Sequence, residues 1–153
     1  MKHVAAFSSA SEEWATPQDL YDAWNAEYRF DLDVAATPDN AKAPRYYTIA
    51  DDGLSQPWEG TVWCNPPYGR GIGKWIQKAY DTSRDGSATV VMLIPARTDT
   101  RWWHDYVAKA YEIHLVKGRL KFGGSAMNAP FPSCVVVFSA EGENATFYHG
   151  GRP

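Results

Sequence analysis

The sequence contains few of the residues that mark metal sites, disulfide-bonded proteins or membrane proteins. There are only two cysteines, Cys64 and Cys134, and four scattered histidines without metal-ligand spacing. Both cysteines lie in apolar runs, which is typical of buried thiols in a reducing compartment rather than of a disulfide. No apolar run reaches membrane-spanning length, and the N-terminus lacks a signal-peptide pattern. We therefore expect a cytoplasmic protein that binds neither a metal nor a membrane.

The sequence also lacks an excess of basic residues. It has 15 Lys and Arg against 18 Asp and Glu, so the formal net charge is -3. DNA-binding domains are commonly basic, so this balance argues against a nucleic-acid partner unless the basic side chains cluster locally. Candidates for such a cluster are Arg97, Arg101, Lys117, Arg119 and Lys121. Aromatic residues are abundant, with seven Trp and nine Tyr, which is weak support for stacking on bases.

The order of helical and extended patterns predicts one α/β domain. A length of 153 residues fits a single domain, which we expect at residues 14–150 behind a polar, flexible arm at 1–13. Apolar periodicity predicts helices at 16–28, 72–80 and 102–110, and strands at 30–36, 46–49, 61–64, 88–94, 111–117, 134–138 and 146–148. Because strands alternate with helices, the sheet should be mostly parallel and flanked by helices.

Two regions depart from this regular alternation. The strands at 111–117 and 134–138 have no helix between them, so they can pair antiparallel at one edge of the sheet. Residues 36–61 are too few for two complete βαβ units, each of which needs roughly 30 residues. We therefore expect the second and third strands to be abbreviated or to lack their helices.

Residues 65–68, Asn-Pro-Pro-Tyr, form the most informative segment. They follow the predicted strand at 61–64 and so lie at its carboxyl end, where open α/β sheets bind ligands. Asn65 offers a carbonyl acceptor, and Pro66 and Pro67 stiffen the backbone while their own carbonyls stay free. Tyr68 adds an aromatic face. This combination can hold a planar group with an exocyclic amine; a plain Asn-Pro turn is the alternative.

This segment resembles the Asn-Pro-Pro-Tyr motif of DNA amino-methyltransferases. Residues 14–139 as a whole resemble the phage-type DNA N-6-adenine methyltransferase (Dam) family. The resemblance implies a Rossmann-like class I methyltransferase fold, S-adenosylmethionine as cofactor and DNA as partner. It also implies methyl transfer to N6 of a flipped-out adenine in a phage-infected or lysogenic bacterial host.

The resemblance assigns a role to each residue of the tetrapeptide. The side-chain carbonyl of Asn65 and the main-chain carbonyl of Pro66 accept from the target amine and orient its lone pair toward the methyl group. Pro67 keeps the loop rigid, and Tyr68 stacks on the base. Cytosine N4 is the less favoured target, because enzymes for that base more often carry Ser in place of Asn65.

Seven residues are expected to contact the cofactor: Thr16, Pro17, Asp31, Asp33, Ala35, Asp51 and Asp52. Asp33 is favoured over Asp31, and it precedes a small-residue turn that resembles the family's first motif. That turn contains Ala35 in place of the usual Gly-rich sequence. Asp52 is a better match than Asp51 to the acid that accepts from the cofactor's adenine amine. A helix cap at residues 16–17 and an Asp-Gly surface turn are the alternatives.

Six residues are expected to contact DNA: Arg70, Arg97, Arg119, Lys121, Phe122 and Phe131. The basic residues lie after predicted strands, at the rim that carries the tetrapeptide, and can contact phosphates or remain solvated. Phe131 is expected to supply a second stacking ring, with Phe122 as the alternative. Core packing is the competing interpretation for both rings.

The chain has no length for a separate target-recognition domain. We therefore expect rim loops to read a short site, low specificity, or help from a homodimer partner or an accessory specificity subunit. Methylation of RNA or of a protein glutamine is an alternative function. A non-catalytic nucleic-acid-binding module is another, because the Gly-rich turn is missing.

Overall fold

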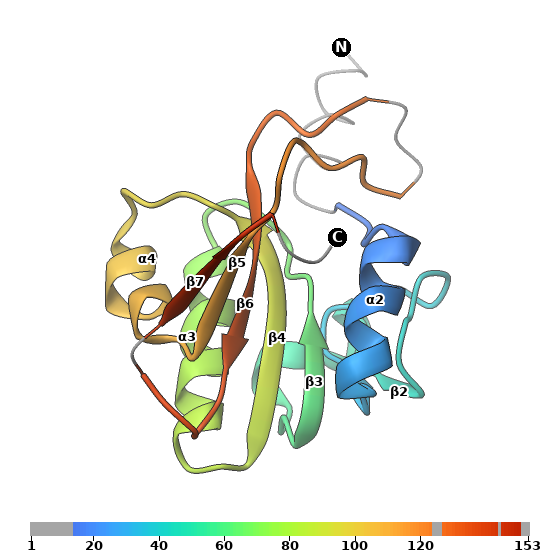
Figure 1. The fold of residues 1–153 in the computed structure, drawn as a ribbon. Coiled ribbons are helices and arrows are strands. Elements are labelled where there is room, and N and C mark those ends of the chain that lie inside the picture. Colours follow the sequence, from blue (N-terminus) through green and yellow to red (C-terminus); the bar gives the residue numbers. More distant parts are fainter. Residues whose placement is uncertain (1–13, 124–126, 144, 151–153) are drawn as a thin grey trace.

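A computed structural model of the chain describes residues 14–123, 127–143 and 145–150, so the arm predicted at 1–13 lies outside it. Seven strands form one sheet in the order β2-β1-β3-β4-β6-β5-β7 (Figure 1). Their bounds are β1 Leu32–Asp33, β2 Arg45–Tyr46, β3 Gly60–Cys64, β4 Ala88–Pro95, β5 Glu112–Leu115, β6 Ser133–Phe138 and β7 Thr146–His149.

The sheet is mostly parallel, as predicted. Strands β2, β1, β3 and β4 pair in parallel, and β7 pairs in parallel with β5. Strand β6 is antiparallel to both of its neighbours, β4 and β5. The antiparallel pairing of the last two strong strands is therefore confirmed, although β7 covers the outer edge of β5. The resulting α/β architecture is that expected of a class I methyltransferase fold.

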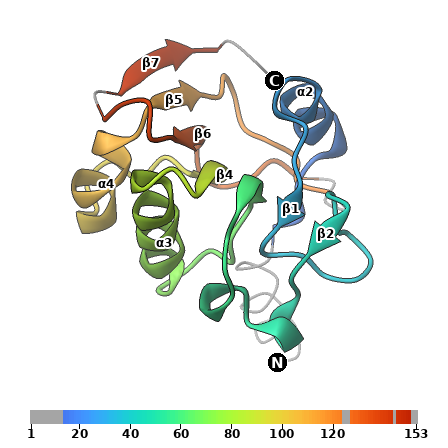
Figure 2. The same cartoon turned by 90° about the horizontal axis from the view of Figure 1, so that it is seen from below.

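Helices lie on both faces of this sheet. Figure 2 shows α2 (Gln18–Tyr28) on one face, and α3 (Ile72–Arg84) and α4 (Arg101–Asp105) on the other. Helix α2 buries Leu20, Tyr21 and Trp24, and α3 buries one apolar stripe that includes Ile72 and Ile76, as helical periodicity predicts. The third predicted helix is shorter than expected, because a 3₁₀ turn at Val107–Lys109 follows α4.

The region between β1 and β3 is abbreviated, as predicted. Strands β1 and β2 have two residues each, and two 3₁₀ turns, Ile49–Asp51 and Gly53–Ser55, replace the usual helices. The strand expected at 30–36 is shorter than predicted, although the N–H groups of Val34 and Ala36 still donate to the carbonyls of Trp63 and Tyr47. The Asp33 carboxylate accepts from the backbone N–H groups of Ala35 and Lys42 and adds a side-chain contact to the turn that follows.

The core consists mainly of β3, β4 and β6 with the helix stripes against them. Strand β4 is buried from Val90 to Pro95, which agrees with its continuous apolar run. Cys64 and Cys134 are fully buried free thiols in this core, as predicted. In the described part of the chain no helix is long and apolar enough to cross a membrane.

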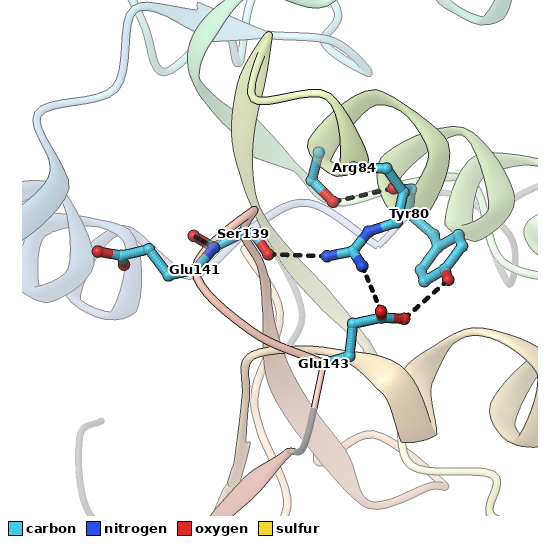
Figure 3. A network of polar contacts seen from close by, with 6 residues as sticks. Tyr80, Arg84, Ser139, Glu141 and Glu143 are labelled. Atoms are coloured by element: carbon cyan, nitrogen blue, oxygen red, sulfur yellow. Dashed lines mark hydrogen bonds and ion pairs between the residues drawn. The ribbon is translucent and has the colours of Figure 1, made fainter.

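A polar network ties the end of α3 to the connection between β6 and β7 (Figure 3). The Arg84 guanidinium donates to the Ser139 carbonyl at 3.1 Å and pairs with the Glu143 carboxylate at 2.8 Å. Glu143 also accepts from the Tyr80 hydroxyl at 3.0 Å. The Arg84 side chain is only partly exposed, and it bonds both the Ser139 carbonyl and the Glu143 carboxylate. The network therefore stabilises the packing of the β6–β7 connection against α3.

We predict that Arg84→Met lowers the free energy of unfolding by about 1–2 kcal/mol, because two acceptors lose a charged donor. Urea denaturation measures the change. Lys74→Met, an exposed position on the same helix, is the matched control and should change stability by less than about 0.5 kcal/mol. Equal losses in the two variants would show that the network contributes nothing specific.

Candidate active site

A cavity of about 710 Å³ opens at the carboxyl ends of β1 and β3. Its lining residues are Trp14, Ala15, Thr16, Asp33, Val34, Ala35, Ala36, Thr37, Asn40, Thr48, Ile49, Asp52, Gly53, Asn65, Pro66, Pro67 and Trp75. The volume is in the range of small-molecule and cofactor sites, and the position is where open α/β sheets bind ligands. The structure therefore brings most of the predicted cofactor residues and most of the tetrapeptide to one place.

Asn65 follows β3 and is held by the segment that precedes α2. Its Nδ2 donates to the main-chain carbonyl of Trp14 and, at 3.0 Å, to the hydroxyl of Thr16. Its Oδ1 is buried and has no hydrogen-bond partner among the residues that the structure describes. A buried carbonyl without a donor is costly, by about 1–3 kcal/mol. This oxygen is therefore a ready acceptor for a ligand.

These contacts change the expectation for Thr16. The sequence predicts Thr16 as the N-cap of the helix, but the N-cap is Pro17 and the first helical residue is Gln18. The Thr16 hydroxyl accepts from Asn65 and makes no capping bond. Thr16 still lines the cavity, whereas Pro17 does not.

Asp33 places a buried carboxylate in the cavity wall. Its side chain accepts from the N–H of Ala35 at 3.3 Å and from the N–H of Lys42 at 3.1 Å. Burial raises the pKa of Asp33 to about 6, and the two backbone bonds together with the Lys42 charge only partly offset this effect. The carboxylate is thus an energetically expensive group, and a cationic ligand would stabilise its charged form.

Asp52 reaches the cavity through a close contact between two loops. A Cβ on Gly53 would lie 2.3 Å from the main-chain oxygen of Val34, so only glycine permits this approach. The indole of Trp58 donates to the Gly53 carbonyl at 2.9 Å and fixes the turn from behind. Gly53 is therefore held in the wall by close packing, and the exposed Asp52 beside it lines the cavity.

Two of the carboxylates predicted to contact the cofactor also lie outside this site. Asp31 is exposed and accepts from the Thr61 N–H at 3.0 Å, at the start of β3 and away from its carboxyl end. Asp51 accepts from the N–H and hydroxyl of Thr48 and closes the turn that precedes Asp52. Both carboxylates have local backbone partners, which explains their positions. Neither carboxylate is among the residues that line the cavity.

Four aromatic rings form a cluster beside Asn65. Tyr68 is buried, and its hydroxyl donates to the Leu93 carbonyl at 3.1 Å. Its ring packs nearly at right angles against Phe122 and Phe131, with centroids at 6.1 and 5.5 Å. Trp14 packs against the same two phenylalanines at 5.4 Å. The predicted stacking residues are therefore together, but the Tyr68 ring is covered by its neighbours.

The predicted basic contacts are exposed and follow three different strands. Arg70 lies between β3 and α3, and Arg97 follows β4, with its guanidinium 5.7 Å from the Phe131 ring centroid. Arg119 and Lys121 follow β5 in the long loop, and Arg119 donates to the Ala129 carbonyl at 3.5 Å. The Arg97 guanidinium thus lies over one ring of the aromatic cluster.

Sequence reasoning missed Trp14, Asn40, Thr48, Ile49 and Trp75. Asn40 and Thr48 belong to an irregular stretch without a motif, and Trp75 fits the apolar stripe of the helix predicted at 72–80. Ile49 is 83% exposed, and that exposure, at the rim of a polar turn, is a signal only the structure provides. Trp14 is the first residue after the predicted arm, and no pattern in the sequence indicates which residues it contacts.

Among the residues that the structure describes, no group of three or more His, Cys, Asp or Glu side chains could hold a metal ion. The lining of the cavity instead combines two carboxylates, small polar side chains and two indoles. It suits an organic ligand with amine or hydroxyl groups better than a metal.

Comparison with known proteins gives consistent matches. The family model described as DNA N-6-adenine-methyltransferase (Dam) matches residues 5–143. The DNA N-6-adenine-methyltransferase of Haemophilus phage HP1 (strain HP1c1) is 30% identical over 118 residues, which cover 74% of this chain and 68% of the phage protein. The DNA N-6-adenine-methyltransferase of Escherichia phage T1 is 29% identical over 110 residues, which cover 70% of this chain and 45% of that protein.

We predict that the stability of Asp33→Asn relative to wild type rises as the pH increases from 4 to 7. The pKa of Asp33 is higher in the folded state, so folding favours the protonated acid and the wild type loses stability as the pH rises through about 6. The difference in unfolding free energy between variant and wild type should grow by roughly 2–3 kcal/mol over this range. Urea titrations at several pH values measure it, with Asp31→Asn as the control for loss of one carboxylate outside the cavity. A difference that does not vary with pH would contradict the prediction.

Proposed function

We propose that this chain, which belongs to the DNA N-6-adenine-methyltransferase (Dam) family, transfers the methyl group in the cavity beside Asn65. Membership of the family gives the activity, methylation of adenine in DNA, and makes DNA the substrate. The observation that carries the placement is the buried Asn65 carbonyl oxygen without a donor in the described part of the chain. It is a specific acceptor at the carboxyl edge of the sheet, where an exocyclic amine can be bound.

S-adenosylmethionine is the methyl donor that the family implies, and the cavity chemistry fits it. The donor carries an ammonium group, a sulfonium and an adenine ring. Asp33 is a carboxylate that a cation would stabilise, and it supports binding of the ammonium group. Asp52 can accept from the donor's adenine amine, and Trp75 offers an apolar wall for the ring. Ala35 permits a close approach of the backbone without a Gly-rich turn.

The tetrapeptide supplies positioning and electrostatics at the target amine. The N6 lone pair of adenine is delocalised into the ring, so the amine is a weak nucleophile. Acceptance of its hydrogens by the Asn65 side chain and the Pro66 main-chain carbonyl favours a tetrahedral nitrogen with its lone pair directed at the methyl group. Pro67 lines the cavity and restricts the loop. The proton leaves after the attack, so no strong base is required.

The base site is closed in the structure. Asn65 Oδ1 is buried, and Phe122 and Phe131 pack against Tyr68. A flipped base can stack on Tyr68 only after one of these rings moves, and both rings belong to the loop between β5 and β6. We assign Tyr68 and Phe131 to the two faces of the base and Phe122 to the closed state.

DNA phosphates are assigned to the exposed basic residues that follow the strands, namely Arg70, Arg97, Arg119 and Lys121. Sequence readout is assigned to the loop between β5 and β6, aided by a homodimer partner or an accessory subunit. Size-exclusion chromatography with and without DNA distinguishes a single chain from a dimer. We propose that the activity takes place in the cytoplasm of a bacterial host; action on DNA and the phage origin of the relatives support this proposal.

We predict that Asn65→Ala lowers the rate of methyl transfer to DNA by at least about 100-fold, because the acceptor for the amine is lost. Labelled S-adenosylmethionine and unmethylated DNA measure transfer, and digestion of the product identifies the methylated base. Calorimetry of cofactor binding should show a change of less than about threefold, which separates loss of chemistry from loss of the cofactor site. N6-methyladenine made equally well by the variant would contradict the assignment.

We predict that Arg97→Gln and Arg70→Gln each weaken DNA binding and reduce the slope of log K against log salt by about 1, as loss of one phosphate contact requires. Fluorescence anisotropy at several salt concentrations measures this slope. Lys109→Gln is the matched control, because Lys109 lies before the amino end of β5, away from the rim. An unchanged slope in both arginine variants would remove these residues from the DNA surface.

A further inference from the structure

The side chain of Asn65 is held in one orientation by a main-chain group. A carboxamide can present either its oxygen or its NH₂ group to a neighbour, and the two ends have nearly the same shape. The neighbour here is the carbonyl oxygen of Trp14, which can only accept. The end of Asn65 that faces Trp14 must therefore be Nδ2, and Oδ1 must point away from it.

Thr16 supplies the second contact to the same nitrogen. Its hydroxyl lies 3.0 Å from Asn65 Nδ2 and accepts the other amide hydrogen. Thr16 is 7% exposed, so water competes little for this bond. With both hydrogens of Nδ2 engaged, the carboxamide plane is fixed, and Oδ1 is left without a partner among the described residues.

The segment that makes these contacts is itself anchored on both sides. Residues 14–16 lead directly into Pro17, the N-cap of α2. The Ala15 carbonyl, between the two groups that hold Asn65, accepts from the Gly123 N–H at 2.8 Å. The segment is thus bound to Asn65 on one side and to the loop between β5 and β6 on the other, and it can hold Asn65 firmly.

We infer that residues 14–16 form an orienting clamp in which the Trp14 carbonyl and the Thr16 hydroxyl position Asn65, so that this chain requires a hydrogen-bond donor at position 65 in addition to an acceptor. The inference rests on the proposed function, because it assumes that Asn65 Oδ1 binds the target amine. Thr16 is a positioning residue, since it acts through Asn65 and need not touch the base.

The clamp has a specific consequence for an acidic residue at position 65. In Asn65→Asp, an ionised carboxylate would place an oxygen against the Trp14 carbonyl, where two acceptors repel. The protonated acid would instead donate to Trp14 and leave its carbonyl oxygen free, which reproduces the wild-type arrangement. Activity of the variant should therefore depend on protonation of this single side chain.

The decisive experiment is the pH profile of methyl transfer by Asn65→Asp, expressed as a ratio to wild type at each pH. Asp33 and Asp52 also line the cavity, and Cys64 and Tyr68 flank Asn65 in the core, so the ratio cancels their common titration. We expect the ratio to be below about 0.01 at pH 8 and to rise roughly tenfold for each unit of pH decrease, until the introduced acid is protonated. A ratio near 1 at pH 8, or a low ratio that does not vary with pH in a folded, cofactor-binding variant, overturns the inference.

Thr16→Val and Thr16→Ser test the hydroxyl separately. Valine keeps the branched shape and removes the acceptor, so kcat should fall about tenfold while the KM for S-adenosylmethionine changes less than twofold. Serine keeps the hydroxyl and should restore kcat to within about threefold of wild type. A rise in KM alone would make Thr16 a cofactor ligand and remove it from the clamp.

Asn65→Ala separates this inference from the proposed function. If that variant methylates adenine as fast as wild type, the proposed function fails and the clamp has no substrate to serve. If Asn65→Ala is inactive and the aspartate ratio does not respond to pH, the function stands and the clamp alone is rejected.

Discussion

The buried carboxylate of Asp33 is the constraint on which the cavity depends. It accepts from the backbone N–H groups of Ala35 and Lys42, two and nine residues further along the chain, and so helps to close the turn between β1 and β2, which has no crossover helix. Thr37 and Asn40, which belong to the same turn, line the cavity. Burial disfavours the charged form of Asp33 and raises its pKa to about 6. A cationic ligand in the cavity would stabilise the charged carboxylate.

The two halves of the site solve different problems. On the cofactor side the wall is open and built from close backbone approaches, such as that of Gly53 to the Val34 oxygen. On the side proposed to bind the base the groups are covered, with the Tyr68 ring packed against phenylalanines. A flipped base can stack on an aromatic ring, and this stacking can offset the free energy needed to displace a neighbouring ring. A small cofactor binds best to a preformed cavity.

The sequence predicted the features that depend on neighbours along the chain. Residues 65–68 could be placed because a turn between a strand and the following helix lies at the carboxyl end of the sheet. The antiparallel pairing of β6 with β5 could be predicted because no helix lies between these strands. Contacts between distant segments could not be predicted. The Trp14 carbonyl carries no side-chain signal, and Thr16 resembles a helix cap until Asn65, 49 residues away, is seen to use its hydroxyl. The cover over Tyr68 likewise depends on rings more than 50 residues further along the chain.

One short segment connects these distant parts. Residues 14–16 contact Asn65 through Trp14 and Thr16, and they contact the loop between β5 and β6 through Ala15. That loop carries Phe122 and Phe131, which cover Tyr68, and the basic residues Arg119 and Lys121. Because the Ala15–Gly123 hydrogen bond joins the loop to the segment, and Pro17 joins the segment to α2, a displacement of the loop would act on the same residues that orient Asn65. The orientation of the acceptor and the position of the aromatic cover are therefore linked through residues 14–16.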